Sequence, residues 1–160
     1  MRKIIILMLF ILIVLPCIAE DVLYLNEKWD KEASKILYEH ELRELNVTPE
    51  KVYELFGYKL SDVRAVFYDL NSDGVNEIIG YVNAPYYWSR DGMSLKILKK
   101  VNGGYENISM VNTAPHLGVY IFATRTAGFY DLKLFPSIEY SPMIVKYNQK
   151  QQYYEYFFPN

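Results

Sequence analysis

Cysteine and histidine are nearly absent from this sequence of 160 residues, which contains one cysteine and two histidines. The single cysteine, Cys17, lies in an apolar N-terminal stretch, so the remainder of the chain can form no disulfide. That remainder offers His40 and His116 as its two imidazoles and no thiolate. A zinc site built from nitrogen and sulfur ligands is therefore excluded, and a hydrophobic core has to hold the fold together.

A large charge excess of either sign is also missing. The sequence has 17 basic and 19 acidic residues, which gives a formal net charge of −2. Nucleic-acid-binding domains carry strongly basic surfaces, and disordered chains combine high net charge with low hydrophobicity. The composition therefore favours a folded protein that binds no nucleic acid, and its length suits a single domain.

The sequence has no apolar run long enough for a permanent membrane span. The N-terminal run, residues 4–15, would cover about 18 Å as a helix, against a hydrocarbon core of roughly 30 Å. Two basic residues precede this run, and the small Ala19 follows it before an acidic pair. This pattern is typical of a secretory signal peptide cleaved after Ala19. We therefore predict a signal peptide at residues 1–19 and one domain at residues 20–160, periplasmic or secreted.

Lipid attachment to Cys17 is the alternative fate of this N-terminus. The residue before Cys17 is Pro16, where the bacterial lipoprotein pattern has a small Gly or Ala, so lipidation is the less favoured interpretation. Cleavage after Ala19 would remove two basic residues and no acidic residue, which lowers the net charge of the mature domain from −2 to −4.

Aromatic residues, by contrast, are abundant, with 16 Tyr, 8 Phe and 2 Trp. Flat rings and β-branched side chains pack well on pleated sheets. Residues 20–57 follow a helical period, with a second helix predicted to begin at Thr48-Pro49 and to stop at Gly57. Eight strand-like segments follow, at residues 63–68, 78–82, 95–99, 105–109, 119–124, 129–135, 143–147 and 153–158. Helices followed by strands predict an α+β fold, with N-terminal helices packed on a curved antiparallel sheet of about eight strands.

One loop between two predicted strands is rich in oxygen ligands. Alternate residues of a tight loop point to the same side, so the side chains of Asp69, Asn71 and Asp73 can converge, and Val75 can turn its carbonyl inward. Glu77 then closes the shell from the start of the next strand. Ca²⁺ accepts six to eight such oxygens in loose geometry, whereas Mg²⁺ demands a near-octahedral set. We therefore predict Ca²⁺ with Asp69, Asn71, Asp73, Val75 and Glu77 as ligands.

The pattern D-x-N-x-D-G-x-x-E at residues 69–77, followed by two isoleucines, resembles the calcium loop of FG-GAP and integrin-type β-hairpins. EF-hand loops share its first six positions, but they have an apolar eighth residue where this chain has Asn76. The resemblance covers a single copy of about fifteen to twenty residues, with Glu77 in place of the usual Asp. It implies a calcium-binding β-hairpin in an exported bacterial protein. The alternative is a polar turn whose side chains cap backbone N–H groups without an ion.

A second loop, residues 84–92, concentrates the residue types of protein interfaces. Tyr86, Tyr87, Trp88 and Arg90 lie within five positions of one another, and Tyr, Trp and Arg are enriched at interface hot spots. We predict that these four residues contact a partner, either a protein or an envelope component. The alternative is a loop folded back over the sheet as a lid on the core.

Taken together, these features predict an exported, calcium-stabilised binding domain without enzymatic activity, such as an inhibitor or an immunity-type protein. No catalytic residue is assigned, because no serine or cysteine nucleophile has a base at a recognisable spacing. The competing hypothesis is an envelope hydrolase that acts on cell-wall glycan with a pair of carboxylates as acid and base.

Overall fold

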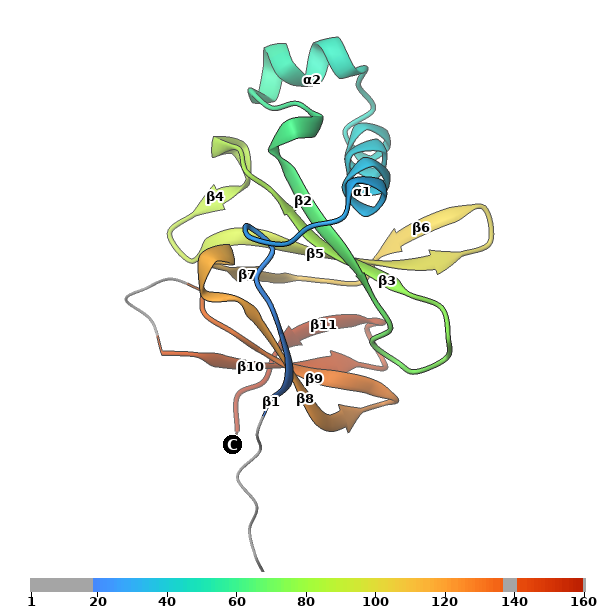
Figure 1. Cartoon of the computed structure of the whole chain (residues 1–160), viewed down its shortest axis with the longest axis vertical. Coiled ribbons are helices and arrows are strands. Elements are labelled where there is room, and N and C mark those ends of the chain that lie inside the picture. Colours follow the sequence, from blue (N-terminus) through green and yellow to red (C-terminus); the bar gives the residue numbers. More distant parts are fainter. Residues whose placement is uncertain (1–18, 137–140, 160) are drawn as a thin grey trace, which may run out of the picture.

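The computed structural model describes residues 19–136 and 141–159, which form eleven strands and two α-helices (Figure 1). Three layers follow one another in Figure 1, with the helices at the top and a sheet in the middle and at the bottom. Residues 1–18 of the predicted signal peptide lie outside the described residues, and Ala19 begins the first strand. No helix in the described part of the chain is long and apolar enough to cross a membrane.

The lower sheet is antiparallel and has the strand order β1-β8-β9-β10-β11. Its strands are β1 (Ala19–Leu23), β8 (Val119–Thr126), β9 (Phe129–Leu134), β10 (Met143–Asn148) and β11 (Tyr153–Tyr156). Tyr154 of β11 also exchanges backbone hydrogen bonds with the segment before β7, because its N–H donates to Ile108 O and its carbonyl accepts from Met110 N. This contact joins the lower sheet to the upper one.

The upper sheet is built around the ten-residue strand β5, which pairs with β3, β4, β6 and β7. Its strands are β2 (Val63–Tyr68), β3 (Glu77–Val82), β4 (Trp88–Ser89), β5 (Gly92–Val101), β6 (Gly104–Asn107) and β7 (Val111–Thr113). Three short 3-10 turns accompany these strands, at η1 (Leu60–Asp62), η2 (Pro85–Tyr87) and η3 (Pro115–Leu117).

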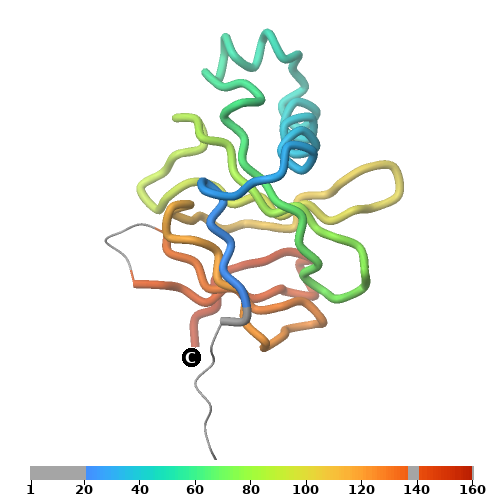
Figure 2. The backbone as a smooth tube through the Cα atoms, viewed as in Figure 1, coloured from blue at the N-terminus to red at the C-terminus, as the bar shows by residue number. Residues whose placement is uncertain are grey.

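The two helices cover the upper sheet, and the tube in Figure 2 shows both on the same side of it. Helix α1 spans Lys31–Glu44 and α2 spans Pro49–Phe56. The Asp30 side chain caps α1, and Thr48 caps α2 with Pro49 in its first turn and Gly57 in the left-handed conformation at its end. The start and stop predicted for α2 are therefore confirmed.

Two apolar cores result from this layering. The inter-sheet core contains Ile79, Leu95, Ile97, Ile121, Leu132 and Tyr154, among others. The helix-side core contains Leu37, Val52, Val63, Ile78, Val82 and Leu98, among others. Strand β3 is buried along its whole length because alternate side chains enter the two cores.

The approach of α1 to the upper sheet is close at Gly80. A Cβ added there would lie 2.5 Å from Arg64 O and 2.8 Å from Leu37 Cδ2, so this position accommodates no larger residue without a shift. The missing side chain lets α1 rest directly on β2 and β3. This contact fixes the position of the α1 side chains that reach the loop at residues 84–92.

The sequence-based expectations are partly confirmed. The α+β class and the antiparallel pairing hold, and each of the eight predicted segments contains a strand. The strand number and the single sheet are wrong, because β1, β4 and β7 add to two sheets. Residues 20–30 are a strand and turns rather than helix, since the pairing of β1 with β8 is a long-range contact. Strands of two and three residues, such as β4 and β7, carry no readable periodicity.

Candidate functional site

The oxygen-rich loop connects β2 to β3, as its position between two predicted strands indicated. Asp69 accepts hydrogen bonds from Asp73 N at 3.2 Å and from Gly74 N at 3.0 Å. Asn71 Oδ1 accepts from Asp73 N at 2.9 Å, and Asp73 Oδ1 accepts from Val75 N at 2.7 Å. Side-chain oxygens at three of the predicted ligand positions therefore bind backbone N–H groups of the loop itself.

Glu77 is the first residue of β3, and its side chain is buried, with 1% of the residue exposed. Its Oε2 accepts a hydrogen bond from Leu70 N at 2.9 Å. Burial raises the pKa of Glu77 to about 7, and the negative charges of Asp73 and Asp69 add to this rise while the Leu70 hydrogen bond opposes it. A cation beside these carboxylates would relieve both their repulsion and the cost of burying Glu77 as an anion.

The residues of this loop suit a calcium ion by chemical type, because all five predicted ligands offer hard oxygens. Asp73, Val75 and Glu77 also line a cavity of about 280 Å³ that faces Lys99 and Lys100. Within residues 19–136 and 141–159, however, no group of three or more His, Cys, Asp or Glu side chains is gathered as a metal site. The loop thus offers oxygen donors of the type that calcium binds, and the side-chain oxygens of Asp69, Asn71, Asp73 and Glu77 accept hydrogen bonds from backbone N–H groups.

Arg125 of β8 fixes this loop to the lower sheet. Its guanidinium lies 4.0 Å from the ring centroid of Tyr130, donates to Ser72 Oγ at 2.6 Å and reaches Asn71 O at 3.4 Å. The Tyr130 N–H donates to Leu70 O at 2.8 Å, which adds a backbone contact between the same segments. The contact of Arg125 with this loop could not be predicted from the sequence, because Arg125 lies 53 positions from Ser72 and no local pattern signals the pairing.

The second loop, residues 84–92, is here called the aromatic loop, and its side chains lie partly on the surface and partly in the core. Tyr86 and Trp88 are 57% and 55% exposed, and Arg90 is also exposed. Tyr87, the fourth predicted contact residue, is buried in the helix-side core. The turn η2 directs Tyr87 inward, where its hydroxyl donates to Glu41 Oε2 at 2.5 Å, so Tyr87 is not part of the exposed surface.

A buried polar cluster, made of His40, Glu41, Tyr87 and Lys96, holds the aromatic loop against α1. Lys96 Nζ lies 3.1 Å from Glu41 Oε1 and 5.5 Å from the centroid of the Tyr87 ring. Burial alone would raise the pKa of Glu41, but His40, Lys96 and Tyr87 hold it below its ordinary value. Burial and the Glu41 carboxylate raise the pKa of Tyr87, so Tyr87 stays a hydrogen-bond donor. His40 is buried, and its Nδ1 lies 3.7 Å from Glu41 Oε1 without a hydrogen-bond partner among the described residues.

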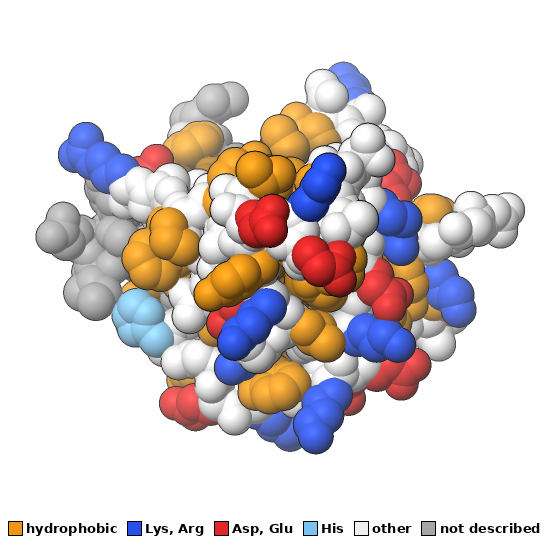
Figure 3. All heavy atoms as spheres, turned by 90° about the horizontal axis from the view of Figure 1, so that it is seen from above, with side chains coloured by type: hydrophobic (Ala, Val, Ile, Leu, Met, Phe, Trp, Pro, Cys, Tyr) orange, Lys and Arg blue, Asp and Glu red, His pale blue; other side chains and the backbone are white. Residues whose placement is uncertain are grey.

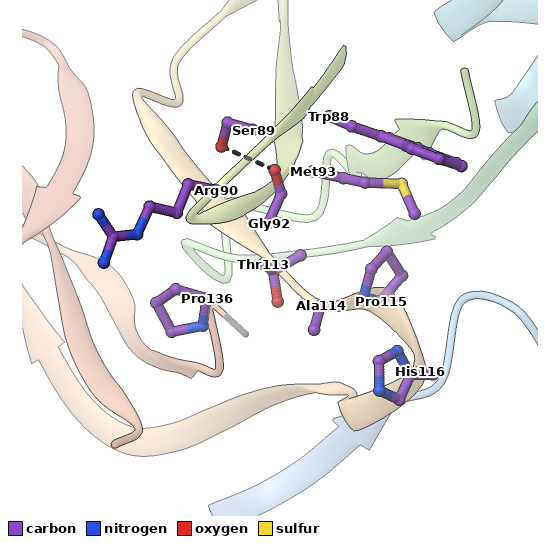
Figure 4. A pocket seen from close by; sticks show the side chains of 10 residues that line it. All are labelled: Trp88, Ser89, Arg90, Gly92, Met93, Thr113, Ala114, Pro115, His116 and Pro136. Carbon is purple, nitrogen blue, oxygen red and sulfur yellow. Dashed lines mark hydrogen bonds between the residues drawn. The ribbon is translucent and has the colours of Figure 1, made fainter. Parts of the chain in front are cut away.

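A cavity of about 470 Å³, here called the Trp88 pocket, opens beside the exposed end of the aromatic loop (Figure 4). It lies where β4, the start of β5, the end of β7 and η3 meet Pro136, the residue that follows Phe135 after β9. Its apolar walls are formed by Trp88, Met93, Ala114, Pro115 and Pro136. Arg90 and His116 also line it, and no carboxylate of the described residues does.

Two hydroxyl groups belong to the lining, that of Ser89, which donates to Gly92 O, and that of Thr113. Thr113 is fully buried, and its Oγ1 has no hydrogen-bond partner in the part of the chain that the structure describes. In Figure 4 this oxygen points into the space between Pro136 and Ala114. A buried hydroxyl without a partner is unfavourable, so a ligand that supplied a partner would gain part of this lost free energy. Residue types alone gave no sign of Thr113, because its burial depends on pairing with β5.

The surface over the helices gives a less specific indication of function than the Trp88 pocket does. The face over the helices shows apolar side chains interspersed with charges of both signs (Figure 3). Exposed apolar residues of this part include Tyr53, Leu55 and Leu60. The hydrolase hypothesis requires a pair of carboxylates in one cavity. Among the described residues, Asp73 and Glu77 line one cavity together, and Asp21 and Glu27 line another. Neither pair borders the Trp88 pocket.

Comparisons with known proteins found no similarity. No family model matches the chain, and no curated protein and no solved structure matches it significantly. The function is therefore inferred from the side chains of the oxygen-rich loop between β2 and β3 and from those of the Trp88 pocket.

Proposed function

We propose that this protein is an exported binding domain without enzymatic activity, which recognises a protein partner through the surface around the Trp88 pocket. The observation that carries this proposal is the exposed Trp88 beside an apolar cavity that Arg90 also lines. Tryptophan and arginine at a concave site are the residue types that contribute most binding energy at interfaces. A periplasmic or secreted inhibitor or immunity-type protein would use such a surface.

The attachment of the aromatic loop supports this role. Tyr87 anchors the loop to Glu41 below it, and the rings of Tyr86 and Phe56 pack edge to face with centroids 4.7 Å apart. A loop held in this way loses little conformational entropy when a partner binds. The backbone that carries Trp88 is therefore held in place, and it pairs with Met93 of β5.

Partner capture with matched variants tests the proposal. The mature domain would be immobilised as wild type, Trp88→Ala, Arg90→Gln and Tyr53→Ala, and exposed to an envelope extract of the source cell. Tyr53 is 60% exposed on α2 and serves as the control for the loss of an exposed aromatic ring. We expect one protein to be retained by wild type and Tyr53→Ala and to be lost or strongly reduced with Trp88→Ala and Arg90→Gln. Equal retention by all four proteins would refute the proposed surface.

We further propose that Ca²⁺ stabilises the loop between β2 and β3. Asp69, Asn71, Asp73 and Glu77 would hold the ion with the carbonyl of Val75. What supports this is the crowding of three carboxylates, one of them buried, in a loop of hard oxygen donors. The ion would fix the hairpin and would take no part in a reaction.

Thermal unfolding with and without calcium tests the ion. At a hundredfold excess over its dissociation constant, a bound ion adds about 2.7 kcal/mol, which corresponds to a rise in Tm of several degrees in a domain of this size. Asp73→Ala removes a ligand and should abolish the rise, whereas Asp91→Ala, an exposed aspartate of another loop, should keep it. If calcium leaves the Tm of wild type unchanged, the loop is a polar turn.

A further inference from the structure

We propose that the Trp88 pocket receives a tyrosine side chain from an acidic stretch of a partner polypeptide. This inference rests on the proposed function and adds the chemistry of the group that is recognised. Three features of the pocket carry it: apolar walls, a buried hydroxyl without a partner among the described residues, and an arginine with no carboxylate beside it in the described lining.

The walls favour a flat ring. Trp88 and Met93 form one side and Pro115 another, and indole, thioether and proline surfaces all pack well against aromatic faces. Figure 4 shows the Trp88 and Met93 side chains extending to the same side of the pocket. A volume of about 470 Å³ lies within the range of small-molecule sites, so the pocket has room for an aromatic ring.

The hydroxyl of Thr113 favours a ring with a polar tip. Its Oγ1 is buried and has no partner in the described chain, although each hydroxyl can both donate and accept a hydrogen bond. A phenylalanine ring would leave this hydroxyl unsatisfied, whereas the phenol of a tyrosine can pair with it once the entering ring displaces the atoms that cover the oxygen. Among the standard side chains, tyrosine best combines an apolar ring with a hydrogen-bonding group at its far end.

Charge favours an acidic neighbour for that tyrosine. The Arg90 guanidinium is exposed and has neither a hydrogen bond nor an ion pair within the described residues. In Figure 4 it extends on the side opposite to Trp88, so it can meet a carboxylate beside an inserted ring. Arginine pairs with carboxylates through two parallel hydrogen bonds, which makes this contact directional.

Three small probes separate the three contacts. N-acetyl-L-tyrosine carries ring, phenol and carboxylate, N-acetyl-L-phenylalanine lacks the phenol, and N-acetyl-L-tyrosinamide lacks the negative charge. Titration of the ¹⁵N-labelled full domain, followed at the Trp88 indole N–H, gives a dissociation constant for each probe. We expect N-acetyl-L-tyrosine to bind more tightly than either of the others by roughly threefold to tenfold.

Two variants assign each preference to its residue. Thr113→Val has nearly the same shape and removes a hydroxyl that has no partner in the described chain, so the fold should persist. It should abolish the preference for tyrosine over phenylalanine and leave the preference for acid over amide. Arg90→Gln should do the reverse, and Arg43→Gln, an exposed arginine on α1, should change neither ratio.

The outcomes distinguish this inference from the proposed function. If no probe shifts the Trp88 indole saturably below about 20 mM, or if both ratios survive in Thr113→Val and Arg90→Gln, the tyrosine pocket is wrong. In that case a partner captured in a Trp88-dependent manner would still support the binding surface. Probe binding with the expected ratios, together with capture indifferent to Trp88→Ala, would keep the pocket and overturn the protein-recognition role.

Discussion

At the scale of single residues, the Trp88 pocket depends on a glycine at the start of β5. Gly92 has φ of +100°, and an added Cβ would lie 2.1 Å from Pro136 O and 2.8 Å from Thr113 O. Both neighbours are backbone atoms, so neither can move away like the end of a flexible side chain. The strand enters between these two carbonyls because Gly92 has no side chain, and Thr113 and Pro136 border the pocket for the same reason.

Gly92→Ala should therefore destabilise the domain by about 3 kcal/mol or more, from left-handed strain together with the clash. Gly103→Ala is the matched control, because Gly103 has φ of +89° and an added Cβ would meet nothing within 4 Å. It should cost about 1 kcal/mol, since only the backbone strain remains. Urea unfolding measures both values, and equal losses would show that the close approach at Gly92 is absent.

A second prediction at this scale concerns the titration of Glu77 in the calcium-free protein. Its pKa is about 7 in the folded state against 4.5 ordinarily, so the folded state favours the protonated carboxyl. Its stabilising contribution is fully present below pH 4.5 and is lost as the pH rises through 7. The loss should amount to about 1–3 kcal/mol.

The control for this titration is Glu77→Gln, which keeps an oxygen for the Leu70 N–H and cannot ionise. In EGTA, the unfolding free energy of wild type relative to that of Glu77→Gln should fall between pH 5 and pH 8. A difference that is constant across this range would mean that Glu77 titrates normally.

At the scale of elements, β5 connects both cores and the pocket. Leu95 and Ile97 enter the inter-sheet core, whereas Leu98 enters the helix-side core and Lys96 reaches Glu41 of α1. The ion pair is largely buried, with 16% of the Lys96 side chain exposed and 2% of that of Glu41. Removing one partner of a buried pair leaves a charge without compensation, whereas removing both does not.

Lys96→Met should thus destabilise the domain by about 2–4 kcal/mol. The double variant Glu41→Gln with Lys96→Met should be more stable than Lys96→Met alone, because the amide that replaces the Glu41 carboxylate carries no charge and can still accept the Tyr87 hydrogen bond. Guanidinium unfolding of the two variants and wild type provides the comparison. A double variant less stable than Lys96→Met would contradict a buried ion pair.

Local patterns carried much of the information on elements. The cap of α2 at Thr48 and its end at Gly57 depend on neighbouring residues, and so does the alternation of each longer strand. The pairing of β1 with β8, the division into two sheets and the bridge from Arg125 to Ser72 join distant segments, and no local period encodes them.

The candidate site was predictable to a similar extent. Composition identified Trp88 and Arg90 as interface types, and both are exposed. Tyr87 has the same chemistry as Tyr86 but faces Glu41, which lies 46 positions away, so its burial was not readable from the loop. Thr113 belongs to the pocket because β7 pairs with β5, and this pairing requires the fold.

At the scale of the whole molecule, the layers separate two surfaces. The oxygen-rich loop joins β2 to β3, whereas the Trp88 pocket lies at the start of β5. No described lining residue of the pocket belongs to that loop. We therefore expect calcium to change the stability of the domain and to leave the probe affinities of the pocket nearly unchanged. Titration of N-acetyl-L-tyrosine with calcium or with EGTA measures this independence, and a large difference between the two would show that the sites are coupled.

A partner protein is expected to contact the surface at Trp88. A photoreactive benzoylphenylalanine placed at position 88 reports such contact directly, with position 53 on α2 as the matched exposed site. Irradiation of intact source cells should yield a covalent adduct of defined mass from position 88 and none from position 53. An adduct from neither position, or the same adducts from both, would contradict recognition through the Trp88 pocket.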